Sequence, residues 1–186
     1  MLSANKNTGR PGAGHKTSTR IRNSTKPTFC AAAPVFYRCA RCRRLMVQQF
    51  AGDGALSLTC CGEAMSELTP RSPADAEAEA GQHLPAMVVS GGFESNALCV
   101  TVGIPPHPMN NEHHLEWIYL YTFQGGQIKF MAPGDRATAI FSLAQSDAYV
   151  YCDRTVCKGS QCKFNCKRGF TAYAYCNRHG LWKNAF

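Results

Sequence analysis

Short apolar runs separated by turn residues dominate the chain from His83 onward. The runs are four to eight residues long, and Gly-Gly and Pro-containing pairs such as Gly125-Gly126 and Pro133-Gly134 divide them. This spacing is typical of an antiparallel β-sandwich or barrel, and no long amphipathic helical stripe occurs. The pattern predicts a mainly β fold with strands at 86–89, 97–102, 115–122, 127–131, 137–143, 148–151 and 171–175.

The composition divides the chain into four predicted segments. Residues 1–33 are rich in Ser, Thr, Asn and Gly and lack apolar periodicity, which predicts a disordered basic tail. Residues 34–68 form a compact module punctuated by cysteines, and 69–82 (TPRSPADAEAEAGQ) is predicted to be a linker. Residues 83–186 then make up the β domain.

The net charge of +8 is concentrated in the tail. Six of the 20 basic residues and none of the 12 acidic residues lie within residues 1–27. Two interpretations of this segment stay open: a mitochondrial or plastid transit peptide, or a solvated extension that carries no targeting signal. We expect a cytoplasmic protein, or an organellar one if residues 1–27 are a transit peptide. A membrane span is not expected, because no run of about 18 apolar residues occurs.

The cysteine content favours metal ligation. There are 11 cysteines, an odd number that cannot pair completely, and the chain is too long for a small disulfide scaffold. Two thiolates from one turn and two from another can surround one tetrahedral ion. Zinc and iron both suit four thiolates, and a purely structural zinc ribbon is an alternative. The predicted ligands are Cys39, Cys42, Cys60 and Cys61.

A second candidate site combines histidines with one cysteine. Four histidines of the β domain occur together with a Cys-x-x-His pair, and imidazoles with a thiolate suit iron, copper or zinc. Five such ligands leave one position of an octahedral ion open for redox chemistry. The residues concerned are His83, His107, His113, Cys176 and His179.

Both candidate sites resemble known families. The segment CCGEAM (60–65) resembles the four-cysteine iron module of desulforedoxin, and HPMNNEHHLEWIYL (107–120) and YAYCNRHGLW (173–182) resemble superoxide reductases of the desulfoferrodoxin and neelaredoxin family. The resemblance implies an immunoglobulin-like sandwich after a desulforedoxin-like module, with two irons per chain. It makes His83, His107, His113 and His179 equatorial ligands and Cys176 the axial one; His114 falls at a non-ligand position.

The resemblance also implies the chemistry. A ferrous ion would give one electron to superoxide, which would leave as hydrogen peroxide, an antioxidant and detoxifying electron-transfer reaction. Rubredoxin or a similar carrier would restore the ferrous state, and a homodimer is expected. Neither a membrane nor nucleic acid is an expected partner.

The sequence departs from the family before the first histidine ligand. Family members commonly have Glu-Lys-His there, whereas this chain has Gly81-Gln82-His83, and Glu79 lies two positions too early to replace the glutamate. The lysine supplies electrostatic steering, so its loss should slow the capture of superoxide more than the electron transfer itself.

The second departure is a cysteine-rich insertion at 152–166. Its thiols could bind a third ion, zinc or iron, form two disulfides, or stay reduced; they are Cys152, Cys157, Cys162 and Cys166. The segment is also basic, and its positive charge could replace that of the lysine missing before His83. The basic residues are Lys158, Lys163, Lys167 and Arg168. Cys30 and Cys99 have no predicted role.

Two other functions compete with the enzyme. A zinc-ribbon module that uses the basic tail to bind nucleic acid would explain the first cysteines, but it leaves the histidines unexplained. A pure electron carrier or an iron-responsive sensor would keep the histidine and cysteine ligands but would not reduce superoxide.

Overall fold

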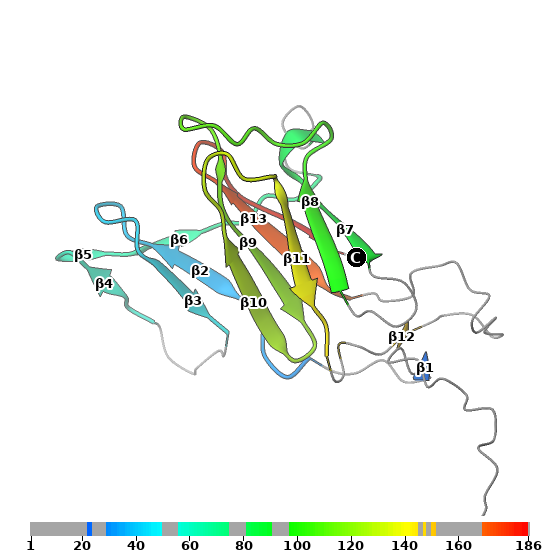
Figure 1. Ribbon diagram of the computed structural model, residues 1–186. Helices are drawn as coiled ribbons and strands as arrows, with labels where there is room; N and C mark the ends of the chain where they lie inside the picture. Colours follow the sequence, from blue (N-terminus) through cyan, green and yellow to red (C-terminus); the bar gives the residue numbers. More distant parts are fainter. Residues whose placement is uncertain are drawn as a thin grey trace, which may run out of the picture.

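Two antiparallel sheets face each other in the computed structural model, which describes residues 22–23, 29–49, 56–74, 81–90, 97–144, 147, 150–151 and 169–185 (Figure 1). The four-stranded sheet has the order β10 (Gly125–Phe130), β9 (Leu115–Thr122), β13 (Thr171–Cys176) and β14 (Gly180–Ala185). The three-stranded sheet has the order β11 (Thr138–Ser142), β8 (Ala97–Val102) and β7 (Pro85–Ser90). The predicted mainly β fold with an antiparallel sandwich is confirmed.

The predicted strands differ from the observed ones at two places. β14 was not predicted, because its sequence GLWKNA contains only two large apolar residues. The run predicted at 148–151 is the short β12 (Val150–Tyr151), which pairs in parallel with β1 (Arg22–Asn23) instead of joining the sandwich. The cysteine-rich insertion 152–166 and most of the predicted tail lie outside the described residues.

The core between the two sheets follows from strand alternation. In β8 every second side chain points inward, so Leu98, Val100 and Val102 are fully buried while the residues between them are partly exposed. Ile118 and Leu120 of β9 meet them from the opposite sheet. Burying this apolar surface supplies the main driving force for the sandwich.

The N-terminal module covers the outer face of the four-stranded sheet. It consists of a sheet with the order β3 (Leu45–Gln48), β2 (Val35–Arg38) and β6 (Ser66–Leu68), and a hairpin of β4 (Thr59–Cys60) and β5 (Glu63–Ala64). Phe36 lies 4.9 Å from Trp117 and 5.1 Å from Tyr173, measured between ring centroids. The central strands β9 and β13 are therefore buried on both faces.

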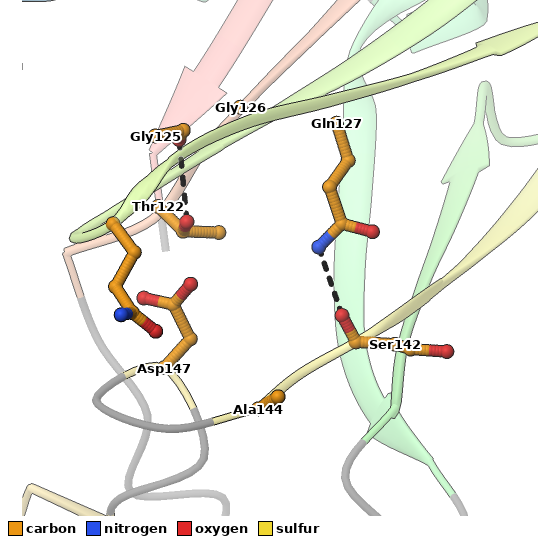
Figure 2. Close-up of a pocket in the computed structure, with 8 residues that line it drawn as sticks. Thr122, Gly125, Gly126, Gln127, Ser142, Ala144 and Asp147 are labelled. Atoms are coloured by element: carbon orange, nitrogen blue, oxygen red, sulfur yellow. Dashed lines mark hydrogen bonds between the residues drawn. The ribbon is translucent and has the colours of Figure 1, made fainter.

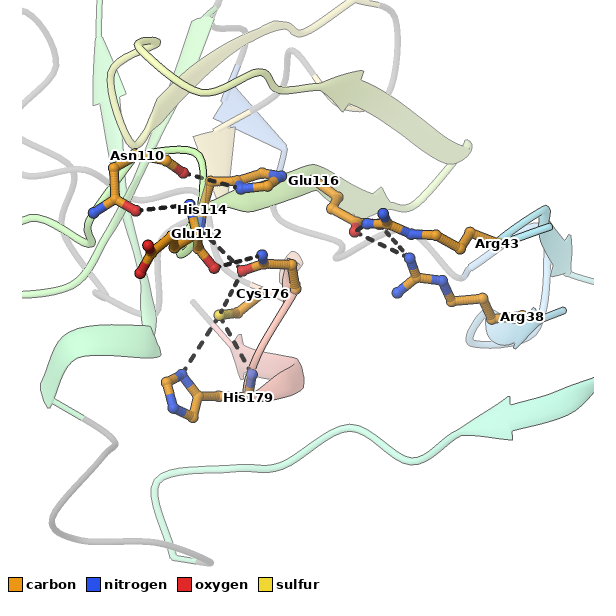
Figure 3. Close-up of polar contacts among 9 residues, drawn as sticks. Arg38, Arg43, Asn110, Glu112, His114, Glu116, Cys176 and His179 are labelled. Atoms are coloured by element: carbon orange, nitrogen blue, oxygen red, sulfur yellow. Dashed lines mark hydrogen bonds and ion pairs between the residues drawn. The ribbon is translucent and has the colours of Figure 1, made fainter. Parts of the chain in front are cut away.

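Ion pairs reinforce this contact beside the aromatic cluster. Arg38 Nη2 donates to both carboxylate oxygens of Glu116, at 2.8 and 3.0 Å, and Arg43 also pairs with Glu116 (Figure 3). The Arg38 guanidinium lies 4.6 Å from the ring centroid of Tyr175, a cation–π contact. The module and the sandwich thus share charged as well as apolar contacts.

Parts of the predicted tail and linker also contact the sandwich. Phe29 stacks on Tyr121 with centroids 4.7 Å apart, and the backbone N–H of Cys30 donates to the carbonyl oxygen of Phe123 at 2.8 Å. Arg71 forms a parallel bridge with Trp182 in β14. Within the described residues, no helix is long and apolar enough to span a membrane.

Candidate metal centres

Three loops at one end of the sandwich carry the predicted histidine and cysteine ligands. His83 ends a helical turn at 81–83 before β7, His107 lies in the loop after β8, and His113 lies two residues before β9. Cys176 is the last residue of β13, and His179 lies in the turn before β14. A register shift between Tyr175 and Cys176 disrupts the pairing of β13 with β9 at this point, and such a bulge re-aims a side chain.

The ligand atoms of four of these residues lie within 4.8 Å of one another: those of His83, His113, Cys176 and His179. His179 Nδ1 is 2.9 Å from His83 Nε2 and 3.2 Å from His113 Nε2. Cys176 Sγ is 3.2 Å from His113 Nε2 and 3.5 Å from His179 Nδ1. This crowding of lone-pair atoms is the geometry of a metal site.

His107 closes the ring of histidines. Its ring centroid is 4.9 Å from that of His83 and 4.6 Å from that of His113, whereas His83 and His113 are 5.9 Å apart. His113 and His179 are 4.8 Å apart, and His179 and His83 are 4.6 Å apart. The ring centroids therefore follow one another at 4.6 to 4.9 Å in the closed order His83, His107, His113 and His179.

The buried ring of His107 has the tautomer that a metal ligand needs. Its Nδ1 lies 2.6 Å from the carbonyl oxygen of Pro108, which can only accept, so Nδ1 carries the proton and Nε2 keeps a lone pair. His107 Nε2 is buried and lacks a hydrogen-bond partner among the described residues. A buried acceptor without a donor is costly, and a bound cation would satisfy it.

Two asparagines that the sequence analysis did not identify hold the ligand loops by hydrogen bonds. The Asn110 side chain accepts from the backbone N–H of Glu112 at 3.0 Å, an Asx turn, and from that of His113 at 2.8 Å. The Asn177 side chain accepts from the backbone N–H of His114 at 2.9 Å and donates to the carbonyl oxygen of Glu112 at 3.0 Å. Their positions within NNEHH and CNRH are the available sequence signal. His114 itself turns away, its Nδ1 3.1 Å from the carbonyl oxygen of Asn110 (Figure 3).

Packing holds His83 against the sandwich. Its ring stacks on the buried Trp182, with centroids 5.0 Å apart and planes 17° apart. Behind it, Gly103 adopts a φ of +83°, and a Cβ there would lie 2.5 Å from the carbonyl oxygen of Gln82 and 2.9 Å from the backbone nitrogen of His107. Only glycine lets the two loops approach this closely.

Burial favours the protonation state that metals bind in two of these histidines, His107 and His113. Desolvation lowers the pKa of His107 to about 4, and burial together with the neighbouring His179 lowers the pKa of His113. Both rings are therefore neutral at pH 7. Cys176 is fully buried, and its Sγ accepts from the backbone N–H of His179 at 3.4 Å.

The four predicted cysteine ligands of the module also converge. The Sγ atoms of Cys39, Cys42, Cys60 and Cys61 lie within 4.8 Å of one another. The adjacent cysteines both reach the centre because Cys61 adopts a left-handed φ of 55°, followed by Gly62 at 83°. A φ in this region is unusual for a non-glycine residue.

The thiols of this four-cysteine cluster oppose each other's ionisation. The backbone N–H of Cys42 donates to Cys39 Sγ at 3.5 Å and lowers the pKa of Cys39 to about 6. The neighbouring thiol of Cys42 raises the pKa of Cys61 to about 12, and it raises the pKa of Cys60 as well. Ionisation of Cys39 is thus favoured, whereas ionisation of Cys60 and Cys61 is opposed. A bound cation would remove this opposition, because it attracts every thiolate.

The other candidate features lie away from both clusters. Cys30 is exposed, and Cys99 is partly buried in β8. A cavity of about 230 Å³ lies at the opposite end of β9 (Figure 2). It is bordered by two hydrogen bonds, Thr122 Oγ1 to the carbonyl oxygen of Gly125 and Gln127 Nε2 to that of Ser142. Its lining includes neither histidine nor cysteine.

Comparison with known proteins shows what the chain is similar to. The family model described as desulfoferrodoxin matches residues 75–185. Desulfoferrodoxin of Nitratidesulfovibrio vulgaris is 32% identical over 147 residues, covering 79% of this chain and 92% of that protein. A desulfoferrodoxin homolog of Archaeoglobus fulgidus is 29% identical and covers 80% of this chain and 94% of its own.

A solved structure has a similar fold. The superoxide reductase from Treponema pallidum matches with a TM-score of 0.57 and 23% identity, covering 82% of this chain and 97% of that one. At this identity the match bears on the fold alone.

Proposed function

The chain belongs to the desulfoferrodoxin family, and from this premise we propose that it is a superoxide reductase, which reduces superoxide by one electron to hydrogen peroxide. The observation that carries the proposal is the closed ring of four neighbouring histidine side chains beside the buried Sγ of Cys176. Four neutral nitrogens and one thiolate leave one of six positions for a small ligand.

The ligands that we propose are His83, His107, His113, Cys176 and His179. The buried Nε2 of His107, which has no hydrogen-bond partner in the part of the chain that the structure describes, supports His107 as the fifth ligand. Family membership implies iron as the metal, and the donor set of imidazoles and one thiolate fits it. Ferrous iron bound there would supply the electron.

The chain's own residues prepare the site for an anionic substrate. Imidazole ligands add no negative charge, and burial, the neighbouring histidines and the nearby Arg178 guanidinium together lower the pKa of His113. Arg178 is anchored by the Glu112 backbone carbonyl, with Nε at 3.0 Å. The backbone N–H of His179 donates a hydrogen bond to the Cys176 sulfur and so stabilises negative charge on it. Asn110 and Asn177 hold the two ligand loops in place.

We further propose the two-iron type, with a second iron in the four-cysteine cluster of residues 34–68. Three facts support it: the convergence of the four Sγ atoms, the CCGEAM motif, and a match to the Nitratidesulfovibrio protein that extends N-terminal to the family model. The domain boundaries, the donor, the homodimer and the compartment stay predictions.

Pulse radiolysis of the reduced protein tests the proposal after iron and zinc are counted per chain. We expect fast oxidation by superoxide, formation of peroxide, and a thiolate-to-ferric absorption band that disappears in Cys176→Ser.

His113→Gln and His114→Gln form a matched pair. The first should lose iron and at least 10-fold in rate, because one ligand is removed, and the second should retain both because His114 faces Asn110. Zinc in the histidine–cysteine cluster, or equal effects of the two variants, would refute the assignment.

A further inference from the structure

The four-cysteine cluster has a buried side and an exposed side. Cys39 and Cys60 are 2% and 8% exposed, whereas Cys42 and Cys61 are exposed to solvent. Arg38, next to Cys39, lies against Tyr175, the neighbour of Cys176. Among the four ligands, Cys42 and Cys61 are the two that a redox partner could approach from solvent.

Arginines surround this exposed side. The segment RCARCRR (38–44) contains four of them, and Glu116 engages Arg38 and Arg43. The other two turn toward the cluster: Arg41 Nη1 donates to the carbonyl oxygen of Cys61 at 3.2 Å, and Arg44 Nη1 lies 3.7 Å from Cys60 Sγ. One guanidinium group thus lies at the backbone of the exposed Cys61, and the other lies beside the thiol of Cys60.

We propose that this surface, residues 40–44 with Cys61 and Gly62, docks a small acidic one-electron carrier protein with a reduced iron–thiolate centre. The proposal rests on the proposed function, since it requires iron in the four-cysteine cluster. One electron passes from the ferrous centre of the carrier, which becomes ferric, to the ferric iron of the cluster, which becomes ferrous. No bond forms or breaks, and no proton is transferred.

The surface suits a transient protein contact better than nucleic acid. The knuckle 39–44 has the sequence CARCRR and offers no aromatic side chain on which a base could stack. Met46, two residues after Arg44 in the chain, is an exposed apolar side chain (43%). A small apolar patch with a charged rim is typical of weak redox encounters, in which charge sets the association rate.

Stopped-flow reduction of the ferric cluster by reduced rubredoxin, used as the acidic probe, tests this. Arg41→Glu should lower the second-order rate roughly 10-fold at low salt. The difference should shrink as salt approaches about 1 M, where the Debye length is about 3 Å. Photoreduction by neutral deazariboflavin should be unchanged. Lys129→Glu, the same charge reversal on β10, should behave as wild type.

Binding is also measured without electron transfer. With zinc in both clusters, oxidised rubredoxin should shift the amide resonances of residues 40–44 and 61–62, and Arg41→Glu should abolish the shifts. A rate insensitive to salt and to Arg41→Glu would overturn the docking surface. So would a labelled oligonucleotide that competes for the same resonances. Superoxide oxidation of the other cluster is followed separately, and its absence would refute the proposed function instead.

Discussion

Replacing Phe36 by alanine tests whether aromatic packing holds the module on the sandwich. Phe36 is 1% exposed, and its ring lies 4.9 to 5.2 Å from those of Trp117, Tyr119 and Tyr173. Deleting a buried phenyl group costs about 3–5 kcal/mol. We expect the lower end of this range, about 3 kcal/mol, because the module and the sandwich can move toward each other and partly close the cavity left by the phenyl group.

Urea titrations and thermal scans, both followed by tryptophan fluorescence and far-UV circular dichroism, measure this loss. At about 2–4 °C per kcal/mol for a chain of this size, Tm should fall by about 6–12 °C. Phe130→Ala is the matched control, because Phe130 is 72% exposed on β10, and it should change stability by about 0.5 kcal/mol or less. If Phe36→Ala destabilises the protein no more than Phe130→Ala does, the module is not held by this cluster.

Four further predictions concern the loops, the histidines and the interface. Gly103→Ala should lower the iron content of the histidine–cysteine cluster, because the added Cβ would displace the His107 backbone. Gly134→Ala is the control: its Cβ would meet no atom within 4 Å at a φ of +92°, so the iron content measured by metal analysis should not change. In the metal-free protein, unfolded His107 takes up a proton near pH 6.5 but the folded residue only near pH 4, so the free energy of unfolding should fall as pH drops through that window. Thermal scans of wild type and His107→Gln check this, and equal slopes would contradict it. Glu116→Gln should cost about 1–3 kcal/mol, since it leaves the charge of the mostly buried Arg38 unpaired, and the exposed Glu67→Gln should be neutral in the same urea titration. Gln82→Lys should raise the second-order rate with superoxide several-fold at low salt, unlike Ser66→Lys on the exposed β6; an unchanged rate in pulse radiolysis would remove steering as the explanation.

The strand pattern and the ligand spacing were readable because both are local. The short apolar run ALCVTV (97–102) predicted β8 with its observed bounds, because a run of this length between turn residues is typical of a strand. The Cys-x-x-Cys and Cys-x-x-His pairs likewise place two donors on one turn. The run LEWIYLYT (115–122) predicted a strand, but its pattern does not say what covers the second face.

The sequence by itself therefore determined the mainly β class, most strands and the residues that converge at the two clusters. Only the tertiary structure decided that Phe36 lies on Trp117, that Asn177 joins the His113 loop to the Cys176 turn, and that His107 Nε2 is buried with no hydrogen-bond partner among the described residues. The reason is physical: periodicity reports which side of an element is apolar, whereas partners distant in sequence are selected by the packing of the whole chain.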